Sequence, residues 1–278
     1  MIKEEEIINK LINIKIKVKE EKPLIHCITN PISINDCANV ILSVGGKPIM
    51  AEHPKEVAEI TAVSKSLAVN LGNITDVRME SMMISGKTAL LNHIPSVIDV
   101  VGVACSNLRM VYAREFIQQC KPSVIKGNMS EIMAICGLQN NAKGIDAGEE
   151  DCAQCKNYEK ILRQISKLSE ETGAVIAVTG KTDIVCSRKT IYEIRNGCDM
   201  LPLITGTGCM VNALIGACLQ KEYIAESVIL AMAIMGIAGE KTSKVKGTGS
   251  FRVGLMDNIY VISEKDIREN LKIHECIS

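Results

Sequence analysis

The chain has 278 residues, which is enough for one large α/β domain or two small ones. Hydrophobic residues make up 47% of it, and Lys+Arg and Asp+Glu both total 32, so that the formal net charge is +0. This balance excludes the basic excess typical of nucleic-acid-binding proteins. Tryptophan is absent and aromatic residues make up only 3%, which argues against base-stacking surfaces and a membrane-interface belt. We therefore expect neither a nucleic acid nor a membrane as a partner.

Twelve cysteines are scattered along the chain, and Cys27, Cys37 and Cys218 lie inside apolar runs. The chain is too long for a small disulfide-stapled domain and shows no signal peptide, so we expect a reducing, cytoplasmic location. Cys152 and Cys155 have the two-residue gap of a metal or redox pair. No second pair follows at zinc spacing, and no strand–helix–strand redox context surrounds them, so the sequence leaves their role open.

Short apolar runs alternate with segments of helical periodicity along the chain. The periodicity predicts helices at residues 7–14, 35–44, 55–65, 76–85, 108–120, 130–137, 158–172, 209–219 and 225–240, and a final one after Ser263. Apolar runs predict strands at 23–27, 48–50, 67–71, 97–101, 123–125 and 174–178, and a hairpin of 182–185 and 190–193 at one edge of the sheet. Ser130 is expected to cap the 130–137 helix, and Ser263 to cap the last one with Asp266 three residues on.

This alternation predicts an α/β fold of parallel β–α–β units, a three-layer α/β/α arrangement with a mostly parallel central sheet. No linker or internal repeat divides the chain, so we expect a single domain over residues 1–278. Ligands of such sheets bind at the carboxyl ends of the strands. The residues that end or follow the predicted strands should therefore share one rim. They are Thr29, Asn30, Met50, Asn70, Asp99, Lys126, Gly127, Asn128 and Thr179.

The stretch from Leu203 to Met210 reads LITGTGCM and leads a glycine-rich loop into a predicted helix. Backbone N–H groups and the helix dipole gather positive partial charge there, which suits phosphate oxygens. The same field favours the thiolate of Cys209. An anion cradle beside a possible base suggests phosphoryl transfer to a small alcohol. Two plainer readings stay open: a loop that only turns a corner, and a cysteine that only fills space.

Two acidic residues on the rim are candidates for a Mg²⁺ shell. Asp99 lies at a strand end, and Glu131 lies in the first turn of a predicted helix. Magnesium keeps several waters and takes few protein carboxylates, so neither residue needs to touch the metal directly. Asp99 has an alternative role as an anchor of the following loop, and Glu131 as a favourable charge at a helix start.

Several short motifs occur in one order along the chain, and together they closely resemble the hydroxyethylthiazole kinase family of thiamin salvage. The resemblance runs from about Pro23 to Tyr260. The motifs that carry it are His26-Cys27-Ile28-Thr29-Asn30, Pro48-Ile49-Met50-Ala51, Asn70-Leu71-Gly72, Lys126-Gly127-Asn128 with Glu131-Ile132, Val178-Thr179-Gly180 and Thr205-Gly206-Thr207-Gly208-Cys209.

The resemblance implies a ribokinase-like fold and ATP-dependent phosphorylation of the hydroxyl of 4-methyl-5-(2-hydroxyethyl)thiazole. It also implies Mg²⁺ as cofactor and a homotrimer with substrate sites at subunit interfaces. Met50 and Gly206 fall on the family's substrate contacts, and Lys126 and Thr179 on its ATP contacts. Cys209 stands where sugar kinases of the wider superfamily keep an aspartate base.

Other residues around these positions complete the expected site. The amides of residues 206 to 209 should neutralise the charge that develops on the transferred group, and Thr205, Thr207 and Gly208 are expected to contact ATP. Asn30 is expected to contact the substrate from the rim. Met50 has a plainer reading as ordinary core packing. His26 is expected to be a structural strand residue.

The chain departs from the family pattern at several positions. Lys126 replaces an arginine, which keeps the charge but loses the bidentate fork, so weaker nucleotide affinity is expected. Ala104 replaces a glycine and matters only if that position needs a positive φ. The remaining departures are Asn73, Val100, Ser106 and Thr248. Two alternative functions therefore stay open: a kinase for another small heterocyclic alcohol such as a hydroxymethylpyrimidine, and a weakly active paralogue that binds its ligands without turnover.

Overall fold

A computed structural model describes residues 2–138 and 152–277. A nine-stranded sheet runs through its centre in the order β2-β1-β3-β4-β5-β6-β7-β8-β9. The strands from β2 to β6 are parallel, and β7, β8 and β9 continue the sheet antiparallel. Their bounds are β1 Leu24–Ile28, β2 Lys47–Ile49, β3 Ser66–Asn70, β4 Ser96–Asp99, β5 Val124–Asn128, β6 Val175–Thr179, β7 Asp183–Ser187, β8 Thr190–Ile194 and β9 Ile273–Ile277.

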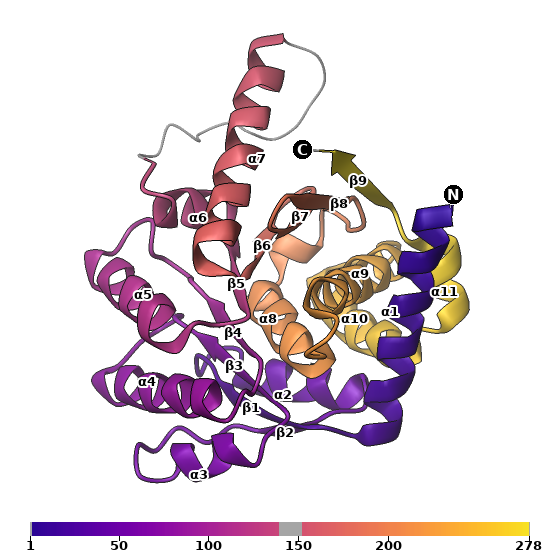
Figure 1. Ribbon diagram of the computed structural model, residues 1–278. Helices are drawn as coiled ribbons and strands as arrows, with labels where there is room; N and C mark the ends of the chain where they lie inside the picture. Colours follow the sequence, from indigo (N-terminus) through magenta and orange to yellow (C-terminus); the bar gives the residue numbers. More distant parts are fainter. Residues whose placement is uncertain (1, 139–151, 278) are drawn as a thin grey trace.

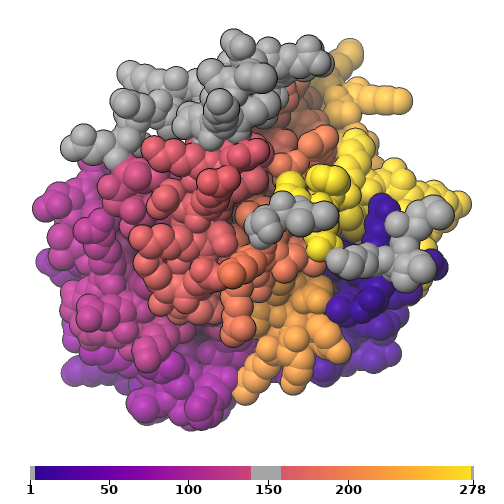
Figure 2. Space-filling view, turned by 45° about the horizontal axis from the view of Figure 1, so that its top comes forward, coloured from indigo at the N-terminus to yellow at the C-terminus, as the bar shows by residue number. Residues whose placement is uncertain are grey.

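Helices cover both faces of the sheet, as the sequence predicts (Figure 1). One face carries α1 Ile2–Glu21, α2 Ile34–Ser43, α8 Thr207–Cys218, α9 Ile224–Thr242, α10 Thr248–Val261 and α11 Glu264–Asn270. The other carries α3 Val57–Ala62, α4 Asp76–Leu91, α5 Asn107–Cys120, α6 Met129–Ile135 and α7 Cys152–Thr172. The first and last helices meet on the first face, where Arg268 of α11 donates to Asn9 Oδ1 of α1 at 2.6 Å. Figure 2 shows the indigo N-terminal segment beside the yellow C-terminal segment.

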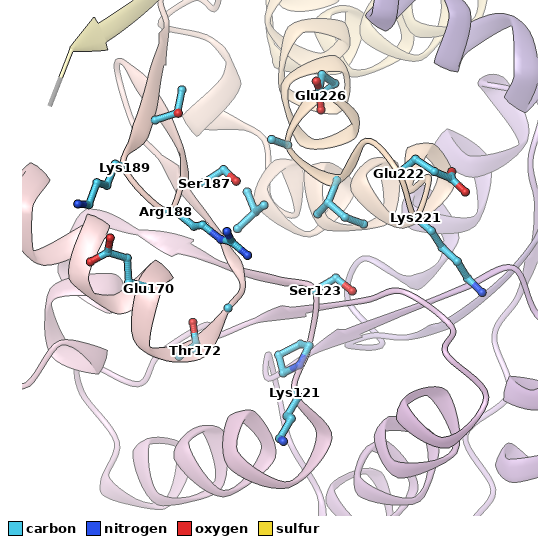
Figure 3. A pocket seen from close by; sticks show the side chains of 16 residues that line it. Lys121, Ser123, Glu170, Thr172, Ser187, Arg188, Lys189, Lys221, Glu222 and Glu226 are labelled. Carbon is cyan, nitrogen blue, oxygen red and sulfur yellow. The ribbon is translucent and has the colours of Figure 1, made fainter.

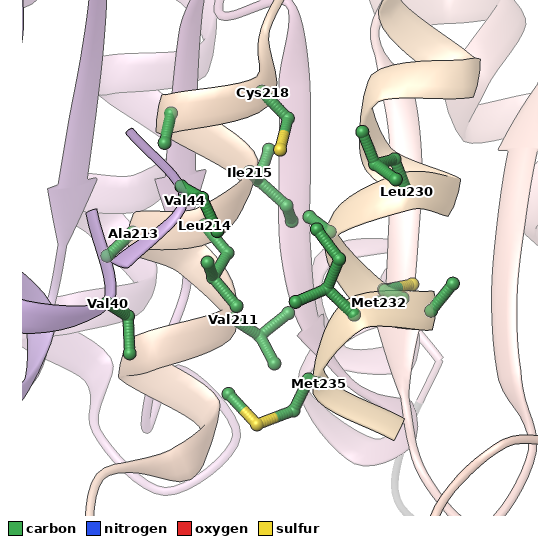
Figure 4. Close-up of a cluster of buried hydrophobic side chains, with 14 of the residues drawn as sticks. Val40, Val44, Val211, Ala213, Leu214, Ile215, Cys218, Leu230, Met232 and Met235 are labelled. Carbon is green, nitrogen blue, oxygen red and sulfur yellow. The ribbon is translucent and has the colours of Figure 1, made fainter. Parts of the chain in front are cut away.

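Alternating strand residues feed two hydrophobic cores, one on each face. In β3, Leu67 and Val69 enter the core under α4 and α5, while Ala68 enters the core under α8. All five residues of this strand are buried, as expected of a parallel strand that is covered on both sides. The larger core joins α2, α8 and α9, and Figure 4 shows Val40, Val211 and Met232 among the side chains that fill it.

Two elements at the carboxyl end of the chain escaped the sequence analysis. Strand β9 pairs with β8, so the β7–β8 hairpin lies inside the sheet, and its predicted place at the edge is wrong. Helix α10 begins in the glycine-rich segment Gly247–Gly249, which has low helix propensity. Its buried residues Phe251, Leu255 and Ile259 are spaced four apart, so packing against the core stabilises the helix despite its weak start.

The N-cap of α6 is Asn128, whereas the sequence analysis assigned it to Ser130. Asn128 Oδ1 accepts the Glu131 main-chain N–H at 2.9 Å, and Glu131 Oε2 accepts the Asn128 main-chain N–H at 2.8 Å, which forms a capping box. Ser130 lies inside the helix and donates its hydroxyl to Asn128 Oδ1 at 2.8 Å. Strand β5 and α6 follow each other without a loop, so the last strand residue is also the cap. At the other end of the fold, Ser263 and Asp266 form the capping box that the sequence predicts.

The two candidate caps of α6 can be separated by substitution. Asn128→Ala should lower the free energy of unfolding by about 1 kcal/mol, because the Glu131 amide loses its acceptor. Ser130→Ala is the matched control and should change stability by less than about 0.5 kcal/mol. Urea unfolding followed by circular dichroism measures both. A larger effect of Ser130→Ala would contradict the assignment.

Candidate functional site

Three neighbouring parallel strands bring polar side chains together at their carboxyl ends. The register pairs Asn70 of β3 with Asp99 of β4, and Asp99 with Lys126 of β5. Asn70 Nδ2 donates to Asp99 Oδ2 at 3.0 Å, and Lys126 Nζ donates to the same oxygen at 2.8 Å. The rim that the sequence predicts therefore exists for these three residues, and all of them are buried.

Lys126 also reaches across to the helix that follows the glycine-rich loop. Its Nζ donates to the Gly208 carbonyl at 3.0 Å. Burial opposes the charge of Lys126, but the Asp99 carboxylate outweighs it and raises the pKa of the lysine above its ordinary value. The cation thus ties β4, β5 and the first turn of α8 together. An ammonium group has three hydrogens, so one donor remains for a ligand.

Asp99 has one carboxylate oxygen that is not used within the described residues. Oδ2 accepts from Asn70 and Lys126, while Oδ1 is buried and has no hydrogen-bond partner there. Burial raises the pKa of Asp99 to about 6, against the opposing effect of Lys126. An unpaired buried acceptor costs free energy unless a ligand satisfies it. This oxygen fits an ion or a water of an ion's shell.

The start of α8 has the geometry that the glycine-rich sequence predicts. Gly206 is the N-cap and has a φ of 91°, and a Cβ there would lie 2.8 Å from the Ser33 Cβ, so only glycine fits. The Met210 N–H donates to the Gly206 carbonyl at 2.8 Å, which leaves the amides of residues 206 to 209 without a partner inside the helix. Thr207 uses its hydroxyl to hold the loop, donating to the Leu201 carbonyl at 3.1 Å. Thr205 is exposed.

Cys209 lies in the first turn of α8 and meets the end of β1. Its side chain is half-buried, and its sulfur accepts a hydrogen bond from Asn30 Nδ2 at 3.1 Å. Met50 is also half-buried and packs, like Cys209, against the larger core. His26 contacts Thr61 Oγ1 at 2.8 Å and the Ala51 carbonyl at 2.9 Å, which makes it the structural residue that the sequence suggests.

Glu131 lies beside the rim, and both of its oxygens accept main-chain hydrogen bonds. Oε1 accepts the Gly102 N–H at 2.8 Å, and Oε2 accepts the Asn128 N–H at 2.8 Å. This arrangement agrees with the structural alternative weighed above, in which Glu131 is a favourable charge at a helix start, and it adds a contact with the loop at Gly102. Each oxygen keeps a second lone pair.

Asp183 belongs to this region, and the sequence analysis missed it. It begins β7, and its Oδ1 accepts the Gly180 N–H at 2.9 Å, next to Thr179. Thr179 Oγ1 donates to the Gly127 carbonyl at 3.4 Å. Burial raises the pKa of Asp183 to about 7, although the Gly180 N–H and the charge of Lys126 lower it. An aspartate directly after a Gly-x-x turn was the only available signal.

The departures in the segment 99–106 leave the backbone intact. Gly102 has a φ of 77°, whereas Ala104 is not among the positive-φ residues of the described chain, so the alanine causes no strain. Ser106 caps α5, with its Oγ accepting the Arg109 N–H at 3.4 Å, so the change from threonine keeps the cap. Asn73 has a φ of 49°, a conformation that asparagine tolerates.

Two other features lie apart from this site. A cavity of about 930 Å³ opens at the amino ends of β5 and β6, lined among others by Lys121, Ser123 and Arg188, and it contains none of the predicted site residues (Figure 3). Cys152 and Cys155 fall in the first turn of α7, but their side chains are outside the described part. In the part that is described, no cluster of three or more His, Cys, Asp or Glu side chains could hold a metal, and no helix is long and apolar enough to cross a membrane.

The fold is that of the ribokinase-like kinases. At 11% sequence identity, the structure matches a ribokinase-like superfamily protein from Enterococcus faecalis V583 with a TM-score of 0.57, covering 85% of this chain and 86% of that one. A far closer match is the structure of a hydroxyethylthiazole kinase protein from Pyrococcus horikoshii OT3. Its TM-score is 0.85 at 30% identity, covering 96% of this chain and 99% of that one.

Sequence comparison narrows the class to one family. The hydroxyethylthiazole kinase family model matches residues 16–265. The chain is 57% identical to hydroxyethylthiazole kinase 2 of Clostridium botulinum strain Hall over 261 residues, which are 94% of this chain and 98% of that protein. It is 40% identical to the hydroxyethylthiazole kinase of strain Eklund 17B, covering 96% and 97%. The chain therefore belongs to the hydroxyethylthiazole kinase family, as its motifs suggest.

The half-buried Asp183, whose pKa is raised by partial burial, should make stability depend on pH. Its pKa rises from 3.8 to about 7 on folding, so the stability that the protonated form contributes is complete below pH 3.8 and is lost as the pH rises through about 7. Asp183→Asn should therefore raise the melting temperature relative to the wild type at pH 8, and less at pH 5. Asp199→Asn removes an exposed carboxylate and is the control. Equal shifts of Asp183→Asn at both pH values would contradict the assignment.

Proposed function

We propose that this chain phosphorylates the hydroxyl of 4-methyl-5-(2-hydroxyethyl)thiazole with ATP, as its family membership implies. The observation that carries the proposal is the meeting of three features at one rim. They are the unpartnered amides at the start of α8, the Cys209 thiol in the same turn, and the buried Lys126–Asp99 pair beside them. Together they supply an anion cradle, a group that can take a proton and a fixed positive charge.

In the proposed reaction, the alcohol oxygen of the thiazole forms a bond to the γ-phosphorus of ATP. The bond from that phosphorus to the bridging oxygen breaks, and ADP leaves. The proton of the alcohol passes to Cys209 Sγ. A thiolate is a weak base for an alcohol, so positioning and electrostatic stabilisation carry most of the rate. The amides of residues 206 to 209 stabilise the charge on the transferred group.

The remaining contacts follow from the same geometry. Lys126 has one free donor for a phosphate oxygen, and Thr179 stands at the end of the neighbouring strand β6, so we assign both to ATP. The amide of Gly208 and the exposed Thr205 face the same ligand, and Thr207 contributes its amide because its hydroxyl holds the loop. Met50 and Gly206 contact the thiazole. The ammonium group of a lysine lacks the bidentate fork of a guanidinium, so it orients phosphate less firmly than the arginine of the family pattern does.

A magnesium ion accompanies ATP in this proposal. The unpartnered Asp99 Oδ1 and the free lone pairs of Glu131 fit a hydrated ion, and the lack of a larger acidic cluster among the described residues suits a metal that keeps its waters. When bound, Mg²⁺ would neutralise phosphate charge. Asp99 Oδ2 is committed to Lys126, so only Oδ1 would be available to hold the ion.

Assembly, location and domain organisation complete the proposal. We assign a homotrimer with sites at subunit interfaces, following the resemblance of the motifs. The cysteines whose side chains are described are all free, which supports a reducing cytoplasm. A single domain over residues 1–278 is supported by one sheet that takes its strands from Leu24 to Ile277.

A coupled ADP-release assay tests the function directly. With ATP and Mg²⁺, turnover of the thiazole alcohol should exceed turnover of a hydroxymethylpyrimidine by at least about tenfold in kcat/KM. Faster turnover of the pyrimidine would favour the alternative kinase. Tight binding of the thiazole without ADP above background would favour a ligand-binding paralogue. The comparisons with relatives do not favour either alternative.

Cys209→Ala tests the proton-acceptor role. We expect kcat to fall by about tenfold or more, while KM for the thiazole alcohol changes by less than about threefold, because the thiol acts chiefly in the transition state. Cys105→Ala removes an exposed cysteine and should leave both constants unchanged. Unaltered kcat in Cys209→Ala would remove the thiol from the mechanism.

Lys126→Met tests the buried ion pair. The variant should lower the free energy of unfolding by about 3 kcal/mol, because Asp99 is left buried without its cation. Adding Asp99→Asn should recover at least half of that loss, since no buried charge remains. Both the single and the double variant should lack kinase activity, because each lacks the Lys126 ammonium group. Urea unfolding and the ADP-release assay measure the two properties separately, and an active double variant would contradict the role of the pair in ATP binding.

A further inference from the structure

The amide of Asn30 has a fixed orientation that decides which of its atoms faces Cys209. Asn30 is buried after β1, and its Oδ1 accepts two hydrogen bonds from Ser33, one from the main-chain N–H at 3.1 Å and one from the hydroxyl at 3.2 Å. A main-chain N–H can only donate, so the atom that faces Ser33 must be the oxygen. The nitrogen therefore faces Cys209 Sγ, at 3.1 Å.

We propose that Asn30 is a positioning residue that acts through Cys209, and that Ser33 holds it in place. Asn30 donates an N–H to the sulfur, which stabilises the thiolate and fixes the direction of the sulfur lone pairs. The proposal rests on the role of Cys209 in the proposed function and adds to it. It assigns to Asn30 a task other than contact with the substrate.

An N–H donor has a definite effect on a sulfur. It cannot accept the S–H hydrogen, so that hydrogen must point away from Asn30 when the thiol is protonated. A hydrogen bond to the charged form of a group favours that form. Asn30 therefore holds the sulfur ready to receive a proton from one side only. Cys209 is half-buried and not sealed in the core, so part of its side chain is accessible to a ligand.

Three other ionisable groups of the described residues face the sulfur of Cys209. Lys126 from β5 is the cation that faces the sulfur, and it is held by Asp99. Cys27 from β1 and Cys37 from α2 also face it. Burial raises the pKa of Cys37 to about 12 and that of Cys27 well above its ordinary value, so both stay neutral at working pH.

Ser33 links the Asn30–Cys209 contact to the glycine-rich start of α8. It is buried at the N-cap of α2, and its Cβ lies where a side chain on Gly206 would have to go. The β1–α2 turn and the start of α8 therefore pack directly on each other. Asn30 gains its rigidity from that contact, so the sulfur and the amides of residues 206 to 209 keep a constant relative position.

The test measures alkylation of Cys209 as a function of pH in the full-length protein without substrates. Iodoacetamide is the probe, and peptide mass spectrometry follows Cys209, with the exposed Cys105 in the same sample as an internal reference. In Asn30→Ala the midpoint of the pH dependence should move up by about one pH unit. Asn30→Asp, which replaces the donor by an oxygen, should move it further. Ser33→Ala should move it in the same direction but less, because one of the two holding hydrogen bonds remains.

Kinetic constants separate positioning from substrate contact. Asn30→Ala should lower kcat by about tenfold with a KM for the alcohol within about threefold of the wild type. An unchanged alkylation midpoint in both Asn30→Ala and Ser33→Ala would overturn the proposal. A raised KM with an unchanged midpoint would also overturn the proposal, and it would support direct contact of Asn30 with the substrate. The alkylation result does not depend on turnover, so it stands apart from a failure of the kinase assay. If Asn30→Ala does not fold, Ser33→Ala alone decides.

Discussion

The buried contact of Lys126 with Asp99 and the Gly208 carbonyl holds the site together. One ammonium group joins two strands of the sheet to the first turn of a helix that lies about 80 residues further along the chain, with distances of 2.8 and 3.0 Å. Desolvation makes such a cation costly, and the carboxylate that compensates for it must stay within bonding distance. The positions of β4, β5 and α8 are therefore coupled, and the amides of α8 cannot drift away from the rim.

The close packing of α8 on the sheet adds to this constraint. Ser66 Oγ donates to the Gly216 carbonyl at 2.6 Å, and a Cβ on Gly216 would lie 3.0 Å from the Ala68 Cβ, so the helix approaches β3 more closely than a larger residue permits. Asn212 Nδ2 donates to the Val69 carbonyl at 3.1 Å. Helix α8 is thus fixed along its length, and its first turn meets the β1–α2 turn through Gly206 and Ser33. A phosphate site of this kind needs rigidity more than reactive side chains.

The layered fold could be predicted because periodicity is a local property. Local patterns correctly predicted a helix around residues 7–14 and a strand around residues 67–71. They also identified Ser263 as a helix cap. The two missed elements share one physical cause. Helix α10 is stabilised by the core contacts of Phe251 and Leu255, and β9 by its pairing with β8, and neither interaction leaves a local pattern. Asn128 ends β5, as the sequence predicts, but its second role as the N-cap of α6 was missed because no loop separates the strand from the helix.

For the site, the sequence by itself determined which chemistry the rim can hold: a glycine-rich helix start, a cysteine in its first turn, and charged residues after the strands. Those properties depend on residue type and spacing. The tertiary structure decided which of these residues contact each other. It paired Lys126 with Asp99, and it placed both oxygens of Glu131 within hydrogen-bonding distance of main-chain N–H groups. It also placed Asp183 beside Gly180. The Asn30 amide contacts Cys209, which lies 179 residues further along the chain. Contacts between distant segments depend on how strands and helices pack, and no local pattern encodes them.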